Sequence, residues 1–177
     1  CPTTWTMTSA RAARVILASA SPRRRELLAS LIDDFQVIPS DVEELLTGDG
    51  FVDAERLAFA KARDIADRHP GATVIGSDTV VFDEERSFGK PDDAVHAMDM
   101  WRLLRGRVHE VATSVAVVGP AGERQLTEVA EVELTALSDA EVHAYVASGR
   151  PMDKAGGYAI QDEDVPTVAA LQGCYCA

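Results

Sequence analysis

Three consecutive arginines follow a serine and a proline in the stretch SASPRRRELL, residues 19–28. Ser21 is a good N-cap and Pro22 suits the first helical turn, so the sequence predicts a helix that begins here. Cations are unfavourable at this end of a helix, because the helix dipole is positive there and each misplaced charge costs about 0.3–1 kcal/mol. A bound anion would offset that cost.

Phosphate is the anion that suits this arrangement best. A strand followed by a helix start presents backbone N–H groups to a ligand above it. Arg23 and Arg24 match the geometry of phosphate oxygens, which guanidinium groups bind in pairs. The hydroxyls of Ser19 and Ser21 add two further donors. The alternative is a helix start whose arginines face solvent or pair with nearby carboxylates, namely Glu26, Asp33 and Asp34.

A second candidate is Asp78, within the stretch VIGSDTVVFD over residues 74–83. It lies in or beside an otherwise apolar strand, where a carboxylate is costly unless it is paired, hydrogen-bonded or bound to a metal. For an isolated residue of this kind, a turn aspartate that caps a backbone amide is the alternative.

Lysine is scarce in this chain, since only three of the 17 basic residues are lysines: Lys61, Lys90 and Lys154. The first lies in a predicted helix beside residues that face a core. The other two lie in loops that contain Gly or Pro, which can hold a cation at a set point. Most loops of this kind are solvent-facing turns, but three retained lysines suit a polyphosphate ligand.

Two further features would complete a site for such a ligand. Gln161 closes the stretch DKAGGYAIQ, and its amide offers both a donor and an acceptor, which suits the edge of a nucleobase. Glu43, Glu44 and Asp78 could hold a divalent cation, which would screen phosphate charge and activate water.

Composition limits the class of protein. The chain has 177 residues, 46% of them hydrophobic, and a net charge of −12, which argues against a nucleic-acid partner because such binding needs a basic surface. No stretch approaches the roughly 18 apolar residues that cross a bilayer, and the start lacks the apolar core of a signal peptide, so we expect a cytoplasmic chain with no membrane partner. The three cysteines support neither a disulfide framework nor a zinc site.

Apolar periodicity predicts a single α/β domain with a mixed sheet and flanking helices. We expect residues 1–13 to be a flexible extension and 14–177 to form the domain. The predicted strands cover residues 14–19, 35–42, 73–82, 108–118 and 125–137, and the predicted helices 22–31, 53–69, 92–105 and 139–148. The last helix opens with a capping box over 138–141, and GPAGE over 119–123 reads as a hairpin turn.

Several of these stretches together resemble the Maf proteins, which are nucleoside triphosphate pyrophosphatases also described as septum-formation inhibitors. The matching stretches are LASASPRRRELL (17–28), SDVEE (40–44), LAFAKA (57–62), IGSDTVV (75–81), GKP (89–91), the spaced residues Gly106, His109, Val111 and Thr113, and DKAGGYAIQ (153–161). They occur in order over nearly the whole chain.

The resemblance implies a fold and a reaction. It implies two lobes around a central cleft, in outline like the inosine triphosphatase group, a divalent cation (Mg²⁺ or Mn²⁺) as cofactor, and a homodimer. It also implies hydrolysis of a nucleoside triphosphate to the monophosphate and pyrophosphate.

The resemblance also assigns roles to residues. Asp78 is the implied proton acceptor and, with Glu43, a metal ligand. The implied phosphate-handling residues are Ser19, Arg24, Lys61, Lys90 and Lys154. Arg23, Thr79 and Gln161 occupy three positions that track substrate choice, in a combination similar to the branch that acts on dTTP and UTP.

Two other hypotheses stay open on the sequence. A nucleotide-binding regulator of cell division would need the same phosphate site without turnover. The family pattern also continues after GCY with a further segment, so we expect a C-terminal truncation, and an inert fragment is the second alternative.

Overall fold

The structure is a computed structural model that describes residues 14–162 and 164–175. The predicted flexible extension over residues 1–13 lies outside this part of the chain, as do Cys1 and Cys176. The described Cys174 is an exposed free thiol.

One mixed sheet runs through the molecule, as the sequence predicted. Its strands are β1 (Val15–Leu17), β2 (Gln36–Val37), β3 (Thr73–Phe82), β4 (Ser87–Phe88), β5 (Val108–Gly119), β6 (Gly122–Leu134) and β7 (Val168–Gln172). The order is β2-β1-β3-β5-β6-β7, with β4 paired to β3. β1 lies parallel to both of its neighbours, whereas β3, β5, β6 and β7 form an antiparallel meander.

Four helices flank the sheet: α1 (Pro22–Ala29), α2 (Gly50–Arg68), α3 (Ala94–Leu104) and α4 (Asp139–Ala147). Two short 3₁₀ turns, η1 (Arg150–Asp153) and η2 (Ala155–Gly157), follow α4. Ser21 caps α1 by accepting from the backbone N–H of Arg24, and Ser138 and Glu141 form the predicted capping box of α4. The chain turns from β5 into β6 within GPAGE, which confirms the predicted hairpin.

One predicted strand is much shorter than expected, and two strands of the structure were not predicted. The strand predicted over 35–42 contains only the two exposed residues of β2, because the rest of that segment forms side-chain and loop contacts instead. β4 was missed since two residues carry no visible periodicity. β7 was missed because its pairing partner β6 lies more than thirty positions earlier in the chain, so no local turn marks it.

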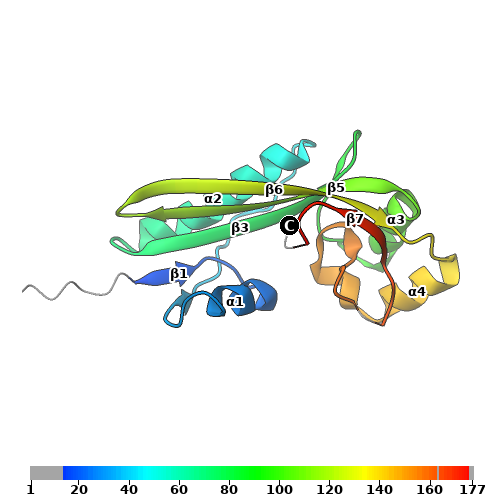
Figure 1. Ribbon diagram of the computed structural model, residues 1–177, viewed down its shortest axis with the longest axis horizontal. Coiled ribbons are helices and arrows are strands. Elements are labelled where there is room, and N and C mark those ends of the chain that lie inside the picture. Colours follow the sequence, from blue (N-terminus) through cyan, green and yellow to red (C-terminus); the bar gives the residue numbers. More distant parts are fainter. Residues whose placement is uncertain (1–13, 163, 176–177) are drawn as a thin grey trace, which may run out of the picture.

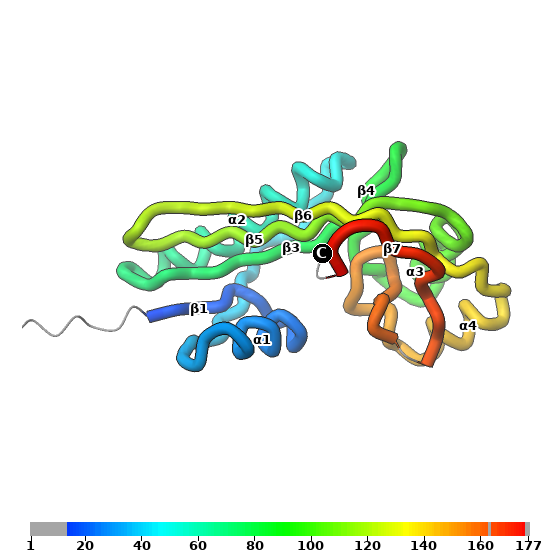
Figure 2. The backbone as a smooth tube through the Cα atoms, in the orientation of Figure 1, coloured from blue at the N-terminus to red at the C-terminus, as the bar shows by residue number. Residues whose placement is uncertain are grey.

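The long strands β3, β5 and β6 extend through two halves of the molecule (Figures 1 and 2). In one half, α2 covers one face of these strands, and β1 and α1 lie along their edge. The other half contains α3, α4, the two 3₁₀ turns and β7. Each half has its own apolar core, one around Ile16, Ile65 and Val74, the other around Trp101 and Tyr145.

Gly76 sets the distance between α2 and β3. A Cβ atom at this position would lie 2.3 Å from the carbonyl oxygen of Ala58 and 2.6 Å from the backbone nitrogen of Ala62, both in α2. The missing side chain therefore lets the helix backbone approach the strand directly. The next residue of β3 that faces α2 is Asp78, so the same close approach brings Lys61 of the helix to it.

We expect Gly76→Ala to destabilise the fold by about 1–3 kcal/mol, because the added methyl group must push α2 away from β3. Urea denaturation measures the change. Gly89→Ala is the matched control, since its new Cβ would meet only the flexible end of Leu46 at 3.4 Å. Equal stability of the two variants would contradict the close-approach explanation.

Candidate active site

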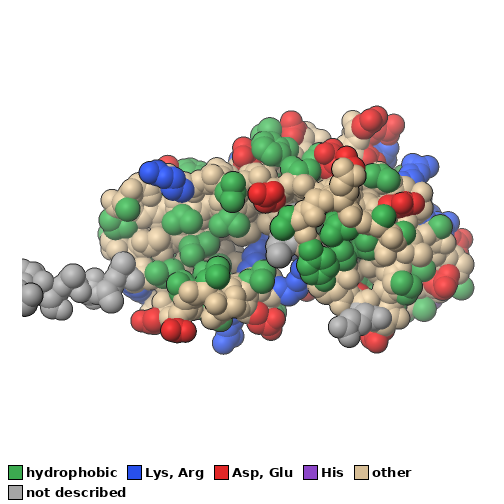
Figure 3. Space-filling model, viewed as in Figure 1, with side chains coloured by type: hydrophobic (Ala, Val, Ile, Leu, Met, Phe, Trp, Pro, Cys, Tyr) green, Lys and Arg blue, Asp and Glu red, His purple; other side chains and the backbone are tan. Residues whose placement is uncertain are grey.

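A cavity of about 1120 Å³ lies between the two halves, and Lys and Arg side chains are visible inside the hollow in Figure 3. Its walls come from the segment after β1, the start of α1, the inner face of α2, the open face of β3 and β5, and the segment from Asp153 to Gln161. Residues from both cores therefore meet at one opening.

The cavity lies against an unpaired edge of β3. β1 pairs with β3 only over residues 73–75, and β4 pairs with it only over 81–82, which leaves residues 76–80 without a described strand on that side. Successive side chains of a strand point to opposite faces. Asp78 and Thr79 therefore reach the same cavity from opposite faces of the sheet.

Asp78 forms a buried ion pair with Lys61. Each residue is 6% exposed, and the Lys61 Nζ donates directly to the Asp78 carboxylate. The same Nζ lies 2.6 Å from Glu44 Oε1, and Glu44 Oε2 lies 2.7 Å from Lys90 Nζ. Two carboxylates and two ammonium groups thus alternate along the cavity wall.

The carboxylates of Asp78 and Glu44 have pKa values shifted in opposite directions. Burial raises the pKa of Asp78 above its usual value, although Lys61 and Arg24 oppose the change. Burial alone would also raise the pKa of Glu44, but hydrogen bonds from Lys61 and Lys90 lower it to about 2. Asp78 is consequently the more basic of the pair, and Glu44 stays ionised in the physiological range.

Only one of the three arginines at the start of α1 turns toward the sheet. Arg24 Nη1 donates to the carbonyl oxygen of Ser77 at 2.8 Å, and its Nη2 donates to Thr79 Oγ1 at 3.2 Å. Arg23 and Arg25 are exposed, although Arg23 lines the cavity. Ser19 is 7% exposed beside the helix start, where its hydroxyl accepts from the backbone N–H of Ser21 at 3.2 Å.

The remaining residues from the sequence motifs lie on the other side of the cavity. Lys154 Nζ donates to the Arg150 carbonyl oxygen at 2.7 Å and lies 2.6 Å from Asp153 Oδ1, so neighbouring groups already compensate its charge. Gln161 is exposed and lines the cavity. These two residues lie across the opening from the ion pairs that Lys61 and Lys90 form with Asp78 and Glu44.

Glu43 does not lie where the sequence placed it. It is exposed and outside the cavity lining, whereas Glu44 lines the cavity and contacts both lysines. Within the described residues, no group of three or more His, Cys, Asp or Glu side chains could hold a metal ion. Among the acidic residues that line the cavity, Asp78 and Glu44 are the two that contact Lys61.

Sequence reasoning missed a buried set of contacts that fixes the segment before Gln161. Trp101 Nε1 donates to the Gly157 carbonyl oxygen at 2.8 Å, and Thr167 Oγ1 donates to the Ala159 carbonyl oxygen at 2.7 Å. His109 Nε2 lies 2.6 Å from the Tyr158 hydroxyl, with the two rings edge to face. A histidine within an alternating apolar strand was the signal that could have indicated this contact.

A family model described as Maf-like protein matches residues 14–177. The chain belongs to the Maf-like protein family. A dTTP/UTP pyrophosphatase of Thermococcus gammatolerans is 44% identical over 161 residues, which are 91% of this chain and 86% of that protein. A dTTP/UTP pyrophosphatase of Thermomicrobium roseum is 45% identical over 168 residues, 92% of this chain and 76% of that protein.

Among solved structures, the Ham1 protein of Staphylococcus aureus superposes on this Maf-like protein with a TM-score of 0.44 at 16% identity, over 70% of this chain and 72% of that one.

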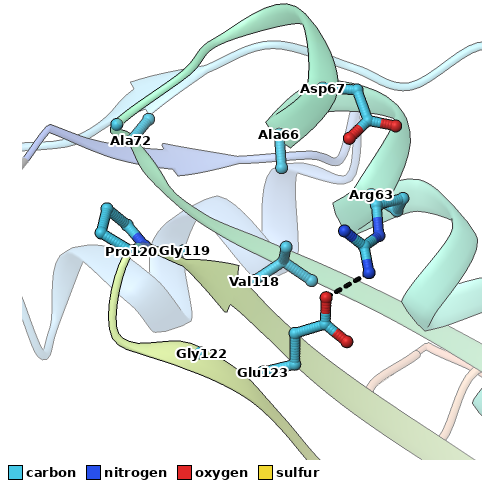
Figure 4. A pocket seen from close by; sticks show the side chains of 10 residues that line it. Arg63, Ala66, Asp67, Ala72, Val118, Gly119, Pro120, Gly122 and Glu123 are labelled. Atoms are coloured by element: carbon cyan, nitrogen blue, oxygen red, sulfur yellow. Dashed lines mark hydrogen bonds and ion pairs between the residues drawn. The ribbon is translucent and has the colours of Figure 1, made fainter.

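A second hollow of about 400 Å³ lies at the far end of the sheet of this Maf-like protein, between the end of α2 and the β5–β6 turn (Figure 4). The guanidinium of Arg63 reaches across it and pairs with Glu123. Because these opposite charges already satisfy each other, this hollow offers a weaker anion site than the large cavity.

We expect the stability of this Maf-like protein to fall between pH 6.5 and 5 through His109. Burial lowers the pKa of this imidazole to about 4 in the folded state, while the unfolded chain takes up a proton near its ordinary pKa of 6.5. Protons therefore favour the unfolded state throughout that window, by about 1–2 kcal/mol between pH 6.5 and 5. Below the folded pKa the effect levels off.

Urea denaturation of the wild type and of His109→Gln at several pH values measures this contribution. The variant keeps a polar side chain but cannot titrate, so its unfolding free energy should fall less over the same window. All other titratable groups are common to both proteins. Parallel pH profiles would show that folding does not lower the pKa of His109.

Proposed function

We propose that this chain hydrolyses dTTP and UTP to the nucleoside monophosphate and pyrophosphate. The observation that carries the proposal is the buried Lys61–Asp78 pair, which lies in a cavity that Arg24 and Lys90 also reach. Near Asp78, three cations (Arg24, Lys61 and Lys90) face two carboxylates (Asp78 and Glu44), in a chain whose net charge is −12. This local excess of positive charge favours a polyphosphate.

The family implies a divalent cation, Mg²⁺ or Mn²⁺, and the residues fit one that binds together with the substrate. Mg²⁺ is usually held by one or two carboxylates, with phosphate oxygens and water as the other ligands. Asp78 and Glu44 both contact Lys61 Nζ, so their carboxylates lie close together and would hold the ion beside that ammonium group. When bound, the cation would screen phosphate charge and acidify a bound water.

Asp78 acts as the proton acceptor in this proposal. Water attacks the α-phosphorus, the bond from that phosphorus to the bridging oxygen of the β-phosphate breaks, and the proton of the water passes to the Asp78 carboxylate. The raised pKa of Asp78 makes it a better base than an ordinary aspartate. Lys61 holds the carboxylate in place through its ion pair.

The cations stabilise the pyrophosphate as it leaves. Lys90 extends from a loop between Gly89 and Pro91, with its side chain half exposed, and can exchange its partner Glu44 for a phosphate oxygen. Arg24 and the hydroxyl of Ser19 lie at the start of α1, where the helix dipole adds to the positive potential. Lys154 and Gln161 are proposed to contact the nucleotide from the opposite wall.

The relatives named as dTTP/UTP pyrophosphatases support the choice of base. Arg23, Thr79 and Gln161 line the cavity and carry hydrogen-bonding side chains, and we propose that they select the base. A site built on such groups rejects ligands that leave its polar atoms unpaired.

We also propose the catalytic unit, the oligomeric state and the cellular compartment in which the reaction takes place. Among the described residues no helix is long and apolar enough to cross a membrane. Residues 14–177 would act as one catalytic domain, as a homodimer in the cytoplasm and without a nucleic-acid partner. Sedimentation of the purified protein tests the dimer.

Asp78→Asn should lower pyrophosphate release from dTTP and UTP by about 10²–10⁴-fold, because it removes the proton acceptor but preserves the shape of the side chain. The exposed Asp67→Asn is the matched control and should leave the rate unchanged. In the wild type, kcat/KM should decrease as the pH falls through the raised pKa of Asp78. Activity of the Asp78 variant within about tenfold of wild type would remove Asp78 from the chemistry.

Lys90→Gln should weaken catalysis at least about tenfold, because its charge would act at short range on the leaving phosphates. Arg124→Gln removes a cation from β6, outside the cavity lining, and serves as the control. Steady-state rates with UTP compare the two. Similar small effects of both substitutions would indicate that the cations of the cavity act only as solvated surface charges.

A further inference from the structure

Thr113 of β5 stands beside Thr79 on the open face of the sheet. The two residues are register partners in the β3–β5 ladder, and both line the cavity. Their hydroxyl oxygens lie 2.9 Å apart. Thr79 Oγ1 also accepts from Arg24 Nη2 at 3.2 Å. Three side chains from three separate elements thus form one hydrogen-bonded chain.

The donors that each group has fix the first link of this chain. The guanidinium of Arg24 only donates, so Thr79 must accept from it. Accepting a bond from a charged donor polarises the Thr79 hydroxyl and favours donation by it in turn. Either threonine can donate in the Thr79–Thr113 pair. In the arrangement in which Thr79 donates to Thr113 Oγ1, the hydrogen of Thr113 is free to bind a ligand.

The surroundings of the two threonines suit a flat apolar ring better than a phosphate. Their neighbours on the cavity side of the sheet are Ser77 and a set of apolar residues that includes Ile75, Val81, Val111, Val115 and Ala130. The ammonium groups of Lys61 and Lys90 gather instead with Asp78 and Glu44, which reach the cavity from the other face of β3. A nucleobase on this face would lie mainly against apolar side chains, with Ser77, Thr79 and Thr113 as the polar residues of the sheet beside it.

We propose that Thr113 is a specificity-determining residue whose hydroxyl donates to the carbonyl oxygen at C4 of uracil or thymine. Cytosine carries an amine at that position, so the Thr113 hydrogen, when Thr79 donates to Thr113, would face a second donor instead of an acceptor. The Arg24–Thr79–Thr113 chain therefore selects pyrimidines with a C4 carbonyl. This inference rests on the proposed function, and it adds a residue to the three positions already proposed to select the base.

Thr113→Val tests the proposal, because valine has the shape of threonine and suits a strand but cannot donate. Calorimetry of UMP and CMP binding measures base preference without turnover. We expect the ratio of UMP to CMP affinity to fall about tenfold in Thr113→Val. Thr113→Ser should keep the ratio within about threefold of wild type, since it retains the donor.

Thr127→Val is the matched control. Thr127 lies on the neighbouring strand β6, but its hydroxyl donates to Glu55 Oε1 at 2.9 Å on the face that α2 covers. Its removal should leave the ratio unchanged. Thermal melts of all variants establish that each is folded, and Thr113→Ser supplies the comparison if the valine variant is not.

The outcomes separate this inference from the proposed function. An unchanged affinity ratio in Thr113→Val would overturn the proposal, and so would an equal loss for UMP and CMP, which would indicate a contact with ribose or phosphate. A ratio that depends on Thr113 would support it even if the protein released no pyrophosphate from UTP, a result that would overturn only the proposed reaction.

Discussion

The buried ion pair between Lys61 and Asp78 constrains how α2 packs on β3 and where the carboxylate lies in the cavity. Each charge loses most of its contact with water, and removing Lys61 would leave the buried Asp78 carboxylate without its ion-pair partner, at a cost of about 3–5 kcal/mol. The pair forms only because Gly76 lets α2 lie directly on β3. A tight helix–strand contact and a reactive carboxylate are thus two results of one missing side chain.

The unpaired edge of β3 gives this pair access to a ligand. In a continuous sheet, residues 76–80 would be covered by a neighbouring strand, and Asp78 and Thr79 would face separate compartments. Because β1 ends early and β4 is short, the cavity extends around the edge and reaches both faces. The ammonium groups of Lys61 and Lys90 gather on one face with Asp78 and Glu44, while the other face carries Ser77 and the two threonines among apolar side chains. A nucleotide has the same division between phosphates and base.

Local signals in the sequence predicted the elements well, and long-range contacts explain what was missed. The cap at Ser21 and the buried position of Asp78 follow from neighbouring residues alone. The choice of Glu44 over Glu43 does not, because the segment between β2 and α2 has no regular periodicity to orient its side chains. The choice of Arg24 among three arginines depends on Ser77 and Thr79, which lie more than fifty positions away. Thr113 acquires a role only through the strand register.

The three long strands belong to both halves of the molecule. Val74 of β3 and Val118 of β5 pack in one core, whereas Val81 and Val111 of the same strands pack in the other. If one core melted, these strands would lose packing along half their length while still hydrogen-bonded along the rest. Neither half can therefore unfold independently, and the molecule should lose its structure in one cooperative step. Because these strands cross from one half to the other as regular secondary structure, the described residues contain no flexible hinge within them about which the two halves could swing apart.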